Sequence, residues 1–343
     1  MSNKPASGSG SRHTIPVIDI APFRSGDPAG SKAVVRAVCD ACEGIGFFVI
    51  TGHGVPTELV DRVFGNGSEF FDLPMEEKLK VRKPPGPDSK GFSPQGLKTV
   101  GKDRDPTLKP SLHESYAIGP LDATDDPYYH CEEAGFSFAP NHWPVNPPGM
   151  KQAMIDYYRE MERLSRDILR IFAQALDVPE AYFLDKINRH TSILRVIHYP
   201  ELKTAPQPGE ERSAAHTDTT AITILRIDDA PGGLQVDTPS GEVIDVRRIP
   251  DSFVINIGDI MMRWTNDRFV STMHRVVNPP PDAGRTARRL SIPFFLLPNY
   301  DAEIVCVPSC EGSGAKYPPT TSGKLLAHRL TVTFSVKQPA AAA

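Results

Sequence analysis

Two periodicities of apolar positions divide the chain into a front part and a back part. In the front part, apolar residues recur at helical spacing over residues 32–44, 57–71 and 150–176, and this spacing predicts three amphipathic helices. The third helix has the longest apolar stripe, which indicates that it packs across a sheet. Two short apolar runs, at residues 15–20 and 47–50, predict strands in the same region.

Beyond residue 192 the pattern changes to short β-rich runs. The predicted strands cover residues 193–199, 221–227, 234–236, 242–246, 253–257, 269–277, 290–297 and 304–307. Turn sequences such as Pro231-Gly232-Gly233 and Pro239-Ser240-Gly241 separate them at close intervals. This cadence predicts a double-sheet β-barrel or jelly roll rather than a parallel sheet with crossover helices.

Together these patterns predict a mixed α+β fold that is mainly β. We expect residues 14–145 to form an N-terminal α/β region, and residues 146–335 to form the barrel core with its long supporting helix. The two regions are expected to pack as one structural unit. Residues 1–13 are small and polar, and they are predicted to be a disordered tail.

Composition narrows the class of protein. Of the 343 residues, 39% are hydrophobic, which is enough for a sizeable core, and the formal net charge is −4. Such mild acidity argues against nucleic acid or an anionic membrane as the main partner. The sequence shows neither the apolar block of a secretory signal nor an apolar run of the roughly 18 residues that span a bilayer. Five cysteines are too few for a disulfide framework, and we therefore expect a soluble cytoplasmic protein.

The most informative motif is His216-Thr217-Asp218. Residues two apart in an extended segment point to the same side, so His216 and Asp218 could bind one ion. A His-x-Asp triplet is common by chance, and taken alone it is also typical of a polar loop before a strand. His274 lies in a later β-rich run, where a barrel interior could hold it opposite the first two. Taken alone, His274 would be interpreted as a buried histidine bonded to backbone, but two histidines and one carboxylate on one face are typical of non-haem Fe(II).

A second motif, Arg289-Leu290-Ser291, opens a predicted strand. Arg289 and Ser291 share strand parity, so both can point into the barrel, whereas Arg288 points the opposite way. A guanidinium beside a hydroxyl makes a receptor for a carboxylate, and burial of Arg289 would be costly without an anionic partner. Tyr199, at the end of an earlier strand, could add a hydrogen bond to the same anion. The alternative is a surface arginine at a strand end.

With these residues in place, the chain resembles the 2-oxoglutarate- and Fe(II)-dependent oxygenases, specifically their isopenicillin N synthase-like branch. The resemblance extends over most of the chain, and the motifs occur jointly in the family's order and spacing. The matching segments are residues 15–19, 46–56, 70–74, 216–218, 233–236, 256–259, 264–266, 274–276 and 289–295.

The resemblance implies a double-stranded β-helix fold and a specific site. It implies that His216, Asp218 and His274 bind the iron, and that Arg289 and Ser291, with Tyr199, bind the far carboxylate of 2-oxoglutarate. The expected enzyme is a dioxygenase that uses Fe(II), 2-oxoglutarate and O2 and releases succinate and CO2. It would hydroxylate, desaturate or cyclise a small molecule such as a natural product.

The expected pocket is enclosed, because a closed barrel with long front loops surrounds it, and this favours a small molecule over a protein as substrate. The resemblance places loops of the front part at the pocket mouth. Phe92 and Tyr116 are therefore expected to contact the substrate from the front part, and Phe295 from a barrel strand.

Two other functions stay open at this point. An oxidase of the same fold could use O2 without 2-oxoglutarate, because isopenicillin N synthase itself shares the Arg-x-Ser pattern without using that cosubstrate. A non-catalytic barrel could bind a small carboxylate, although the intact set of His216, Asp218 and His274 argues against it. Cys39-Asp40-Ala41-Cys42 has the spacing of a redox or zinc motif. Its place in an amphipathic helix, without a second Cys pair, indicates core packing instead.

Overall fold

A computed structural model describes residues 14–86, 90–96, 105, 107–202, 204, 206–280, 282–283 and 287–335. The predicted tail at residues 1–13 lies outside these described residues. No helix in the described part of the chain is long and apolar enough to cross a membrane.

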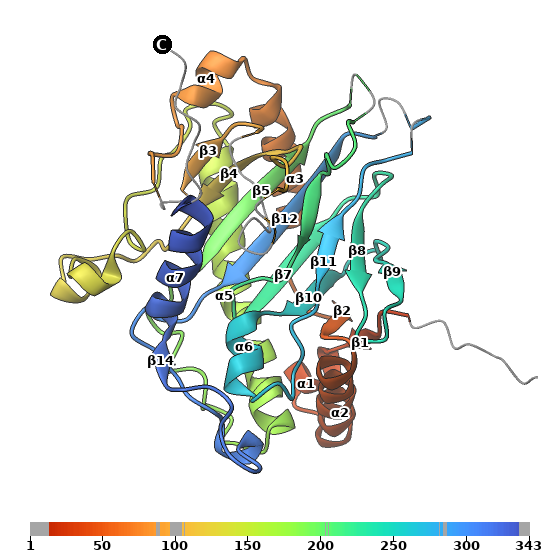
Figure 1. Cartoon of the computed structure of the whole chain (residues 1–343), viewed down its shortest axis with the longest axis vertical. Helices are drawn as coiled ribbons and strands as arrows, with labels where there is room; N and C mark the ends of the chain where they lie inside the picture. The colour runs from red at the N-terminus through yellow and green to blue at the C-terminus, as the bar shows by residue number, and fades with distance from the viewer. Residues whose placement is uncertain are drawn as a thin grey trace, which may run out of the picture.

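An eight-stranded sheet and a four-stranded sheet form the body of the protein (Figure 1). The strands of the large sheet, in spatial order, are β1 (Val17–Asp19), β2 (Phe47–Thr51), β10 (Phe253–Ile257), β7 (Ile222–Ile227), β12 (Arg289–Leu296), β5 (Ile193–Tyr199), β4 (Glu114–Ile118) and β3 (Gly91–Ser93). The strands of the small sheet are β6 (Ser213–His216), β11 (His274–Val276), β8 (Leu234–Asp237) and β9 (Val243–Asp245). The two sheets face each other across the candidate site, so the predicted mixed fold with a jelly-roll core is confirmed.

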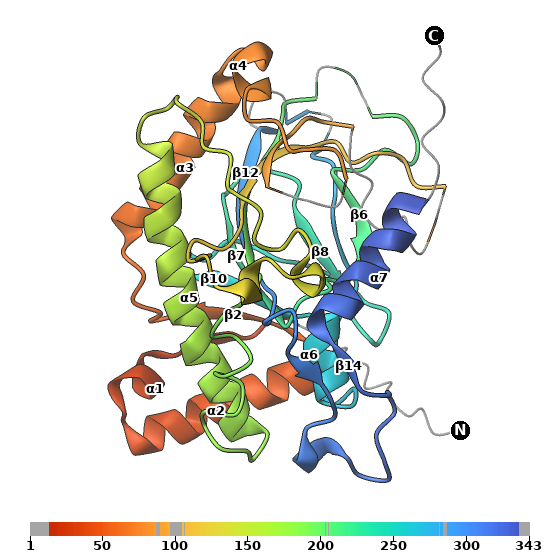
Figure 2. The ribbon, with the colours of Figure 1, turned by 90° about the vertical axis from the view of Figure 1, so that its left-hand side faces the viewer.

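Helices cover the outer face of the large sheet (Figure 2). The helices of the front part are α1 (Ala21–Ser25), α2 (Pro28–Gly44), α3 (Thr57–Asp72), α4 (Met75–Leu79) and α5 (Met150–Ala175). The later elements are α6 (Asp259–Trp264), the strand pair β13 (Glu303–Ile304) and β14 (Thr320–Thr321), and α7 (Ser322–Ser335). Short 3-10 turns are η1 (Pro127–Tyr129), η2 (Glu132–Ala134) and η4 (Pro308–Cys310).

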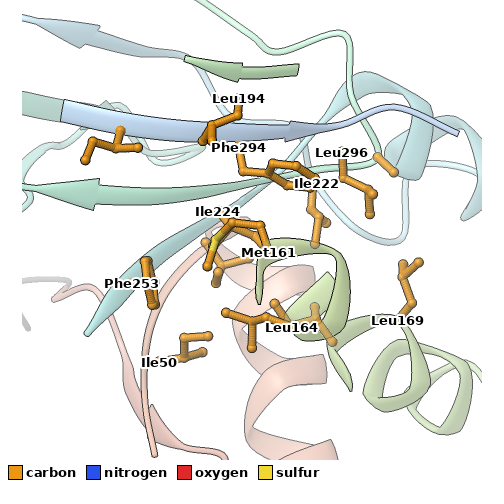
Figure 3. Close-up of a cluster of buried hydrophobic side chains, with 14 of the residues drawn as sticks. Ile50, Met161, Leu164, Leu169, Leu194, Ile222, Ile224, Phe253, Phe294 and Leu296 are labelled. Carbon is orange, nitrogen blue, oxygen red and sulfur yellow. The ribbon is translucent and has the colours of Figure 1, made fainter. Parts of the chain in front are cut away.

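The main core lies between α5 and the large sheet (Figure 3). Met161 and Leu164 of α5 face Ile224 of β7 and Phe294 of β12, and all four side chains are buried. Since side chains alternate along a strand, the residues of β12 on either side of Phe294 point to the other side of the sheet. That other side is the interior between the two sheets, where the polar residues of the site lie.

The front part and the back part share the large sheet. β1 and β2 lie beside β10 at one end, and β3 and β4 lie beside β5 at the other. Just after α2, Gly46 has a φ of 68°, and a Cβ there would clash with the carbonyl oxygen of Val270. Only glycine fits this close approach, which brings the front part against the segment that leads to His274.

Several predicted boundaries were wrong. The predicted strand at residues 269–277 is reduced to β11, because residues 269–273 form a connection after α6. Helix α6, which begins directly after Gly258, was not predicted from the sequence. Strands β3, β4 and β6 and helix α7 were missed too. These strands are only 3 to 5 residues long, too short for alternation to stand out.

Candidate metal centre and carboxylate pocket

The three predicted metal ligands lie together at one end of the small sheet. His216 is the last residue of β6 and His274 the first of β11, and the two face each other in the strand register. Asp218 follows two residues after His216, just beyond the strand. One ligand atom from each side chain lies within 4.8 Å of the others, so a single ion can contact all three.

Backbone carbonyls orient both histidines. The Nδ1 atom of His216 lies 2.8 Å from the carbonyl oxygen of Ala214, and that of His274 lies 3.1 Å from the carbonyl oxygen of Thr272. A carbonyl can only accept, so each Nδ1 carries the proton and each Nε2 has a lone pair for a metal. The Nε2 atoms of the two rings lie 3.7 and 3.8 Å from the Asp218 carboxylate oxygens.

Asp218 is held as a carboxylate. Its Oδ2 atom accepts hydrogen bonds from Thr223 Oγ1 at 2.6 Å and from Asn256 Nδ2 at 2.9 Å. Burial alone would raise the pKa of Asp218, but His274, His216 and these two hydrogen bonds keep that pKa below its usual value. Thr223 was not singled out from the sequence, because nothing local marks a threonine on a neighbouring strand as a partner of Asp218.

Two later helices fix the loop between the ligands. Thr217 donates its hydroxyl to Asp259 of α6 at 3.1 Å, and Arg329 of α7 donates to the carbonyl oxygen of Thr217 at 3.2 Å. Figure 2 shows α7 lying on the side of the small sheet. The candidate metal centre is therefore braced by an element near the end of the described chain.

The structure also brings the three residues of the predicted carboxylate receptor together. In the register of β5 and β12, Arg289 is paired with Tyr199, and Ser291 with Ile197. The side chains of Arg289, Ser291 and Tyr199 line the same cavity as the metal ligands. The complete lining is His113, Arg195, Ile197, Tyr199, Ser213, His216, Asp218, Thr223, Leu225, Ile227, Leu234, Asn256, His274, Val276, Arg289, Ser291, Pro293 and Phe295.

Arg289 is 3% exposed, and the protein satisfies only part of its guanidinium. Its Nη1 atom lies 3.3 Å from Asp228 Oδ1 and 3.5 Å from the carbonyl oxygen of Ala230. Its Nε atom is buried and has no hydrogen-bond partner among the described residues. The sequence predicted an anionic ligand as the partner of Arg289 and did not identify Asp228 as a partner within the protein. The unpaired Nε can still donate a hydrogen bond to a further acceptor.

A second buried arginine adds positive charge near this receptor. Arg212 donates to the carbonyl oxygens of Pro231 and Ala287, and its Cζ lies 5.5 Å from the centre of the Tyr199 ring. Burial and the nearby Arg289 lower the pKa of Arg212 to about 10. Burial raises the pKa of Tyr199, against the effects of Arg289 and Ser291, so the phenol stays protonated as a donor. Two guanidinium groups beside one carboxylate, Asp228, suit a bound dicarboxylate.

Two of the three predicted substrate residues lie elsewhere. Phe295 lines the cavity, but Phe92 and Tyr116 are 0% exposed and contact Phe70 of α3 in the core. Tyr116 is paired with Val196, a core residue of β5. Because it shares the parity of Val196, its side chain points to the helices, and the prediction for Phe92 and Tyr116 is corrected on this ground.

Other candidate features are separate from this site. Cys42 is buried in the core and Cys39 is half-buried beside it in α2. A larger cavity of about 920 Å³ lies between residues 120–143 and α5. Among the residues that the structure describes, His216, Asp218 and His274 form the group whose ligand atoms lie close enough together to hold a metal ion. Ligand chemistry rather than cavity size therefore identifies the candidate site.

Comparisons with known proteins agree with this geometry. A family model described as the N-terminal region of non-haem dioxygenases in morphine synthesis matches residues 15–146, and that of the 2OG-Fe(II) oxygenase superfamily matches residues 190–298. A 2-oxoglutarate-Fe(II) type oxidoreductase of Emericella nidulans is 36% identical over 315 residues, which cover 89% of this chain and 86% of the relative. The chain belongs to the 2OG-Fe(II) oxygenase superfamily.

Solved structures of other proteins are also similar to this oxygenase. A full-length Neurospora crassa protein in complex with α-ketoglutarate has a TM-score of 0.82 and 31% identity, over 96% of this chain and 100% of that one. JOX2, in complex with 2OG, Fe and JA, has a TM-score of 0.73 and 27% identity, over 93% and 85% of the two chains. The predicted enzyme class, with Fe(II) and 2-oxoglutarate as cofactor and cosubstrate, is confirmed.

Proposed function

We propose that His216, Asp218 and His274 bind the Fe(II) of this oxygenase, and that Arg289, Ser291 and Tyr199 bind 2-oxoglutarate. The observation that carries the proposal is the convergence of the three ligand atoms within 4.8 Å, with both Nδ1 atoms turned to carbonyls. The orphaned Nε of Arg289 supports the second assignment.

Each residue has a distinct task in the proposed reaction. With 2-oxoglutarate and O2, the iron supplies the oxidising chemistry, and succinate and CO2 are released. Asp218, held as a carboxylate by Thr223 and Asn256, offsets part of the metal charge. Arg289 and Ser291 fix the far carboxylate, so that the other end of the cosubstrate is directed to the metal. The walls of the cavity keep bulk water away from the reacting groups.

The substrate is proposed to be a small molecule. Among the relatives, a validamycin A dioxygenase of Streptomyces hygroscopicus subsp. limoneus is 28% identical over 322 residues, which cover 91% of this chain and 85% of the relative. The Neurospora crassa protein has also been solved with thymine. The cavity between the two sheets, with Phe295 in its lining, supports a small molecule as substrate.

The test removes one ligand. In Asp218→Ala, Fe(II) affinity should fall by more than about a hundredfold, beyond the loss typical of residues that only support a ligand. The absorption band that 2-oxoglutarate produces with Fe(II) under anaerobic conditions should disappear. Both are measured by titration, and thermal unfolding checks that the variant is folded. The double variant Cys39→Ser, Cys42→Ser is the control and should keep its metal.

Three results would contradict the proposal. Full Fe(II) binding by folded Asp218→Ala would exclude this carboxylate as a ligand. Metal binding by the wild type without the 2-oxoglutarate band would favour an oxidase that does not use that cosubstrate. Absence of Fe(II) binding by the wild type would favour a non-catalytic carboxylate-binding barrel.

A further inference from the structure

Another arginine faces the cavity of the proposed iron site. Arg195 lies in β5 and shares the cavity-facing parity of Ile197 and Tyr199. Its Cζ atom lies 5.3 Å from the centre of the Phe295 ring. Neither a hydrogen bond nor an ion pair holds this guanidinium among the residues that the structure describes. In this it differs from Arg212 and Arg289, which are both bonded to protein oxygens.

Arg195 is separate from the proposed 2-oxoglutarate receptor. Tyr199, which faces Arg289 in the register, lies four residues further along β5, roughly 13 Å away at about 3.3 Å per residue. Phe295 is six residues from Arg289 on β12. The pair of Arg195 and Phe295 therefore forms one end of the cavity, and Arg289 with Tyr199 forms the other.

When the formal charges around the cavity are added up, the positive charge of Arg195 has no negative charge to balance it. A divalent metal, Asp218 and the doubly charged 2-oxoglutarate together carry one negative charge. Arg289 and Arg212 against Asp228 carry one positive charge, so these two groups balance. Burial lowers the pKa of Arg195 to about 10, with Asp218 opposing this shift, so Arg195 is protonated at neutral pH. Arg195 is half-buried, faces the cavity and has no carboxylate partner among the described residues, so it suits an anionic ligand.

The geometry points to Arg195 as the anchor for a carboxylate of the oxidised substrate, which makes the substrate class a small monocarboxylic acid. This inference rests on the proposed function, because it assumes that 2-oxoglutarate occupies the Arg289 end. A guanidinium binds a carboxylate through two parallel hydrogen bonds. The Phe295 ring beside Arg195 attracts the guanidinium and offers an apolar surface to the rest of the substrate.

Matched pairs of probes test the inference. Protein loaded anaerobically with Fe(II) and 2-oxoglutarate is titrated with benzoate and benzamide, and with hexanoate and hexanamide. Binding is followed through the absorption band of the loaded site and through the thermal unfolding temperature. The acids should bind at least about tenfold more tightly than the amides, because a neutral amide cannot replace the charged partner.

Variants then assign the effect to Arg195. Arg195→Gln should weaken binding of the acids by about ten- to a hundredfold, while 2-oxoglutarate affinity changes by less than about twofold, since its receptor lies at the other end. Arg195→Lys should recover part of the loss, because it keeps the charge without the fork. Arg189→Gln is the matched control, since the exposed Arg189 stacks on Tyr128 and does not line this cavity.

Several outcomes would overturn the inference. They are equal binding of acids and amides, no binding of either acid, and unchanged binding of the acids by Arg195→Gln. If Arg195→Gln lowers 2-oxoglutarate affinity as much as Arg289→Ala does, Arg195 belongs to the cosubstrate receptor instead. Absence of the absorption band in the wild type would contradict the proposed function itself, and is thereby distinguished from failure of the Arg195 assignment.

Discussion

At the scale of single residues, the adjacent arginines 288 and 289, where β12 begins, have different surroundings. Arg289 points into the cavity, where it meets Asp228. Arg288 points to the outer face, where it contacts Asp72 at 2.8 Å and His198 Nε2 at 3.0 Å. Because successive side chains of an extended chain face opposite sides, we expect Arg289 to contribute to cosubstrate binding and Arg288 to contribute to stability.

Arg289→Ala should weaken 2-oxoglutarate binding by about ten- to a hundredfold, the effect of losing charge-assisted hydrogen bonds. Arg288→Ala should leave that affinity unchanged. It should lower the free energy of unfolding by about 1–2 kcal/mol, because Asp72 loses its ion pair and His198 loses a hydrogen bond. Anaerobic titration of the Fe(II) protein and denaturant unfolding measure the two quantities. The reverse assignment, with Arg288→Ala as the binding-deficient variant, would mean that the register of β12 is shifted by one residue.

At the scale of elements, a buried charge network joins α4 to the large sheet. Glu114 of β4 accepts from Lys78 Nζ of α4 at 3.0 Å and from His198 Nδ1 of β5 at 2.8 Å. The Nε2 atom of His198 accepts from Arg288, so its Nδ1 carries the proton. Burial alone would raise the pKa of Glu114, but His198 and Lys78 hold that pKa below its usual value.

This network should make the protein sensitive to acid. The pKa of Glu114 is lower when folded than when unfolded, so its contribution to stability is present above about pH 4.3, the ordinary value. That contribution is lost as the pH falls through the folded-state pKa. At pH 7, Glu114→Gln should therefore lower the free energy of unfolding by about 3 kcal/mol, since Lys78 stays buried without a carboxylate.

Denaturant unfolding at a series of pH values measures this effect. Below about pH 4.3 the unfolding free energy of Glu114→Gln should fall less steeply with acid than that of the wild type. Glu58→Gln, a change on the exposed side of α3, should follow the wild-type curve. Parallel curves for Glu114→Gln and wild type would show that Glu114 does not contribute to the acid dependence.

At the scale of the whole molecule, the front part completes the sheet that carries the site. β2 pairs with β10, and β4 pairs with β5. Removal of the front strands would expose two edges of the large sheet, together with the apolar surface that α3 covers on the outer face. Unpaired edges and exposed cores favour aggregation.

Residues 146–335 expressed alone should therefore lack a cooperative thermal unfolding transition and should not bind Fe(II). The full chain should unfold in a single transition, measured by calorimetry with near-ultraviolet circular dichroism as a second probe. A folded fragment that binds Fe(II) would show that residues 146–335 form an independent domain.

Local sequence patterns were enough to predict the helices that bury one face. The helices at residues 28–44, 57–72 and 150–175 have apolar stripes, and a stripe is visible in the sequence because helix periodicity is local. The candidate metal ligands could be singled out for a related reason. The motif of His216 and Asp218, with His274 further on, combines residue types that few other chemistries require, and its spacing matches a known family.

The tertiary structure alone decided the contacts between distant segments. Asp228 beside Arg289, Thr223 beside Asp218 and Arg329 beside Thr217 are ordinary surface residue types in the sequence. Tyr116 was predicted to face the pocket, but pairing with Val196 turns it to the core. A sequence records the order of residues and their local periodicity. Which side of a strand meets which neighbour depends on register and strand order, and these are fixed by packing of the whole chain.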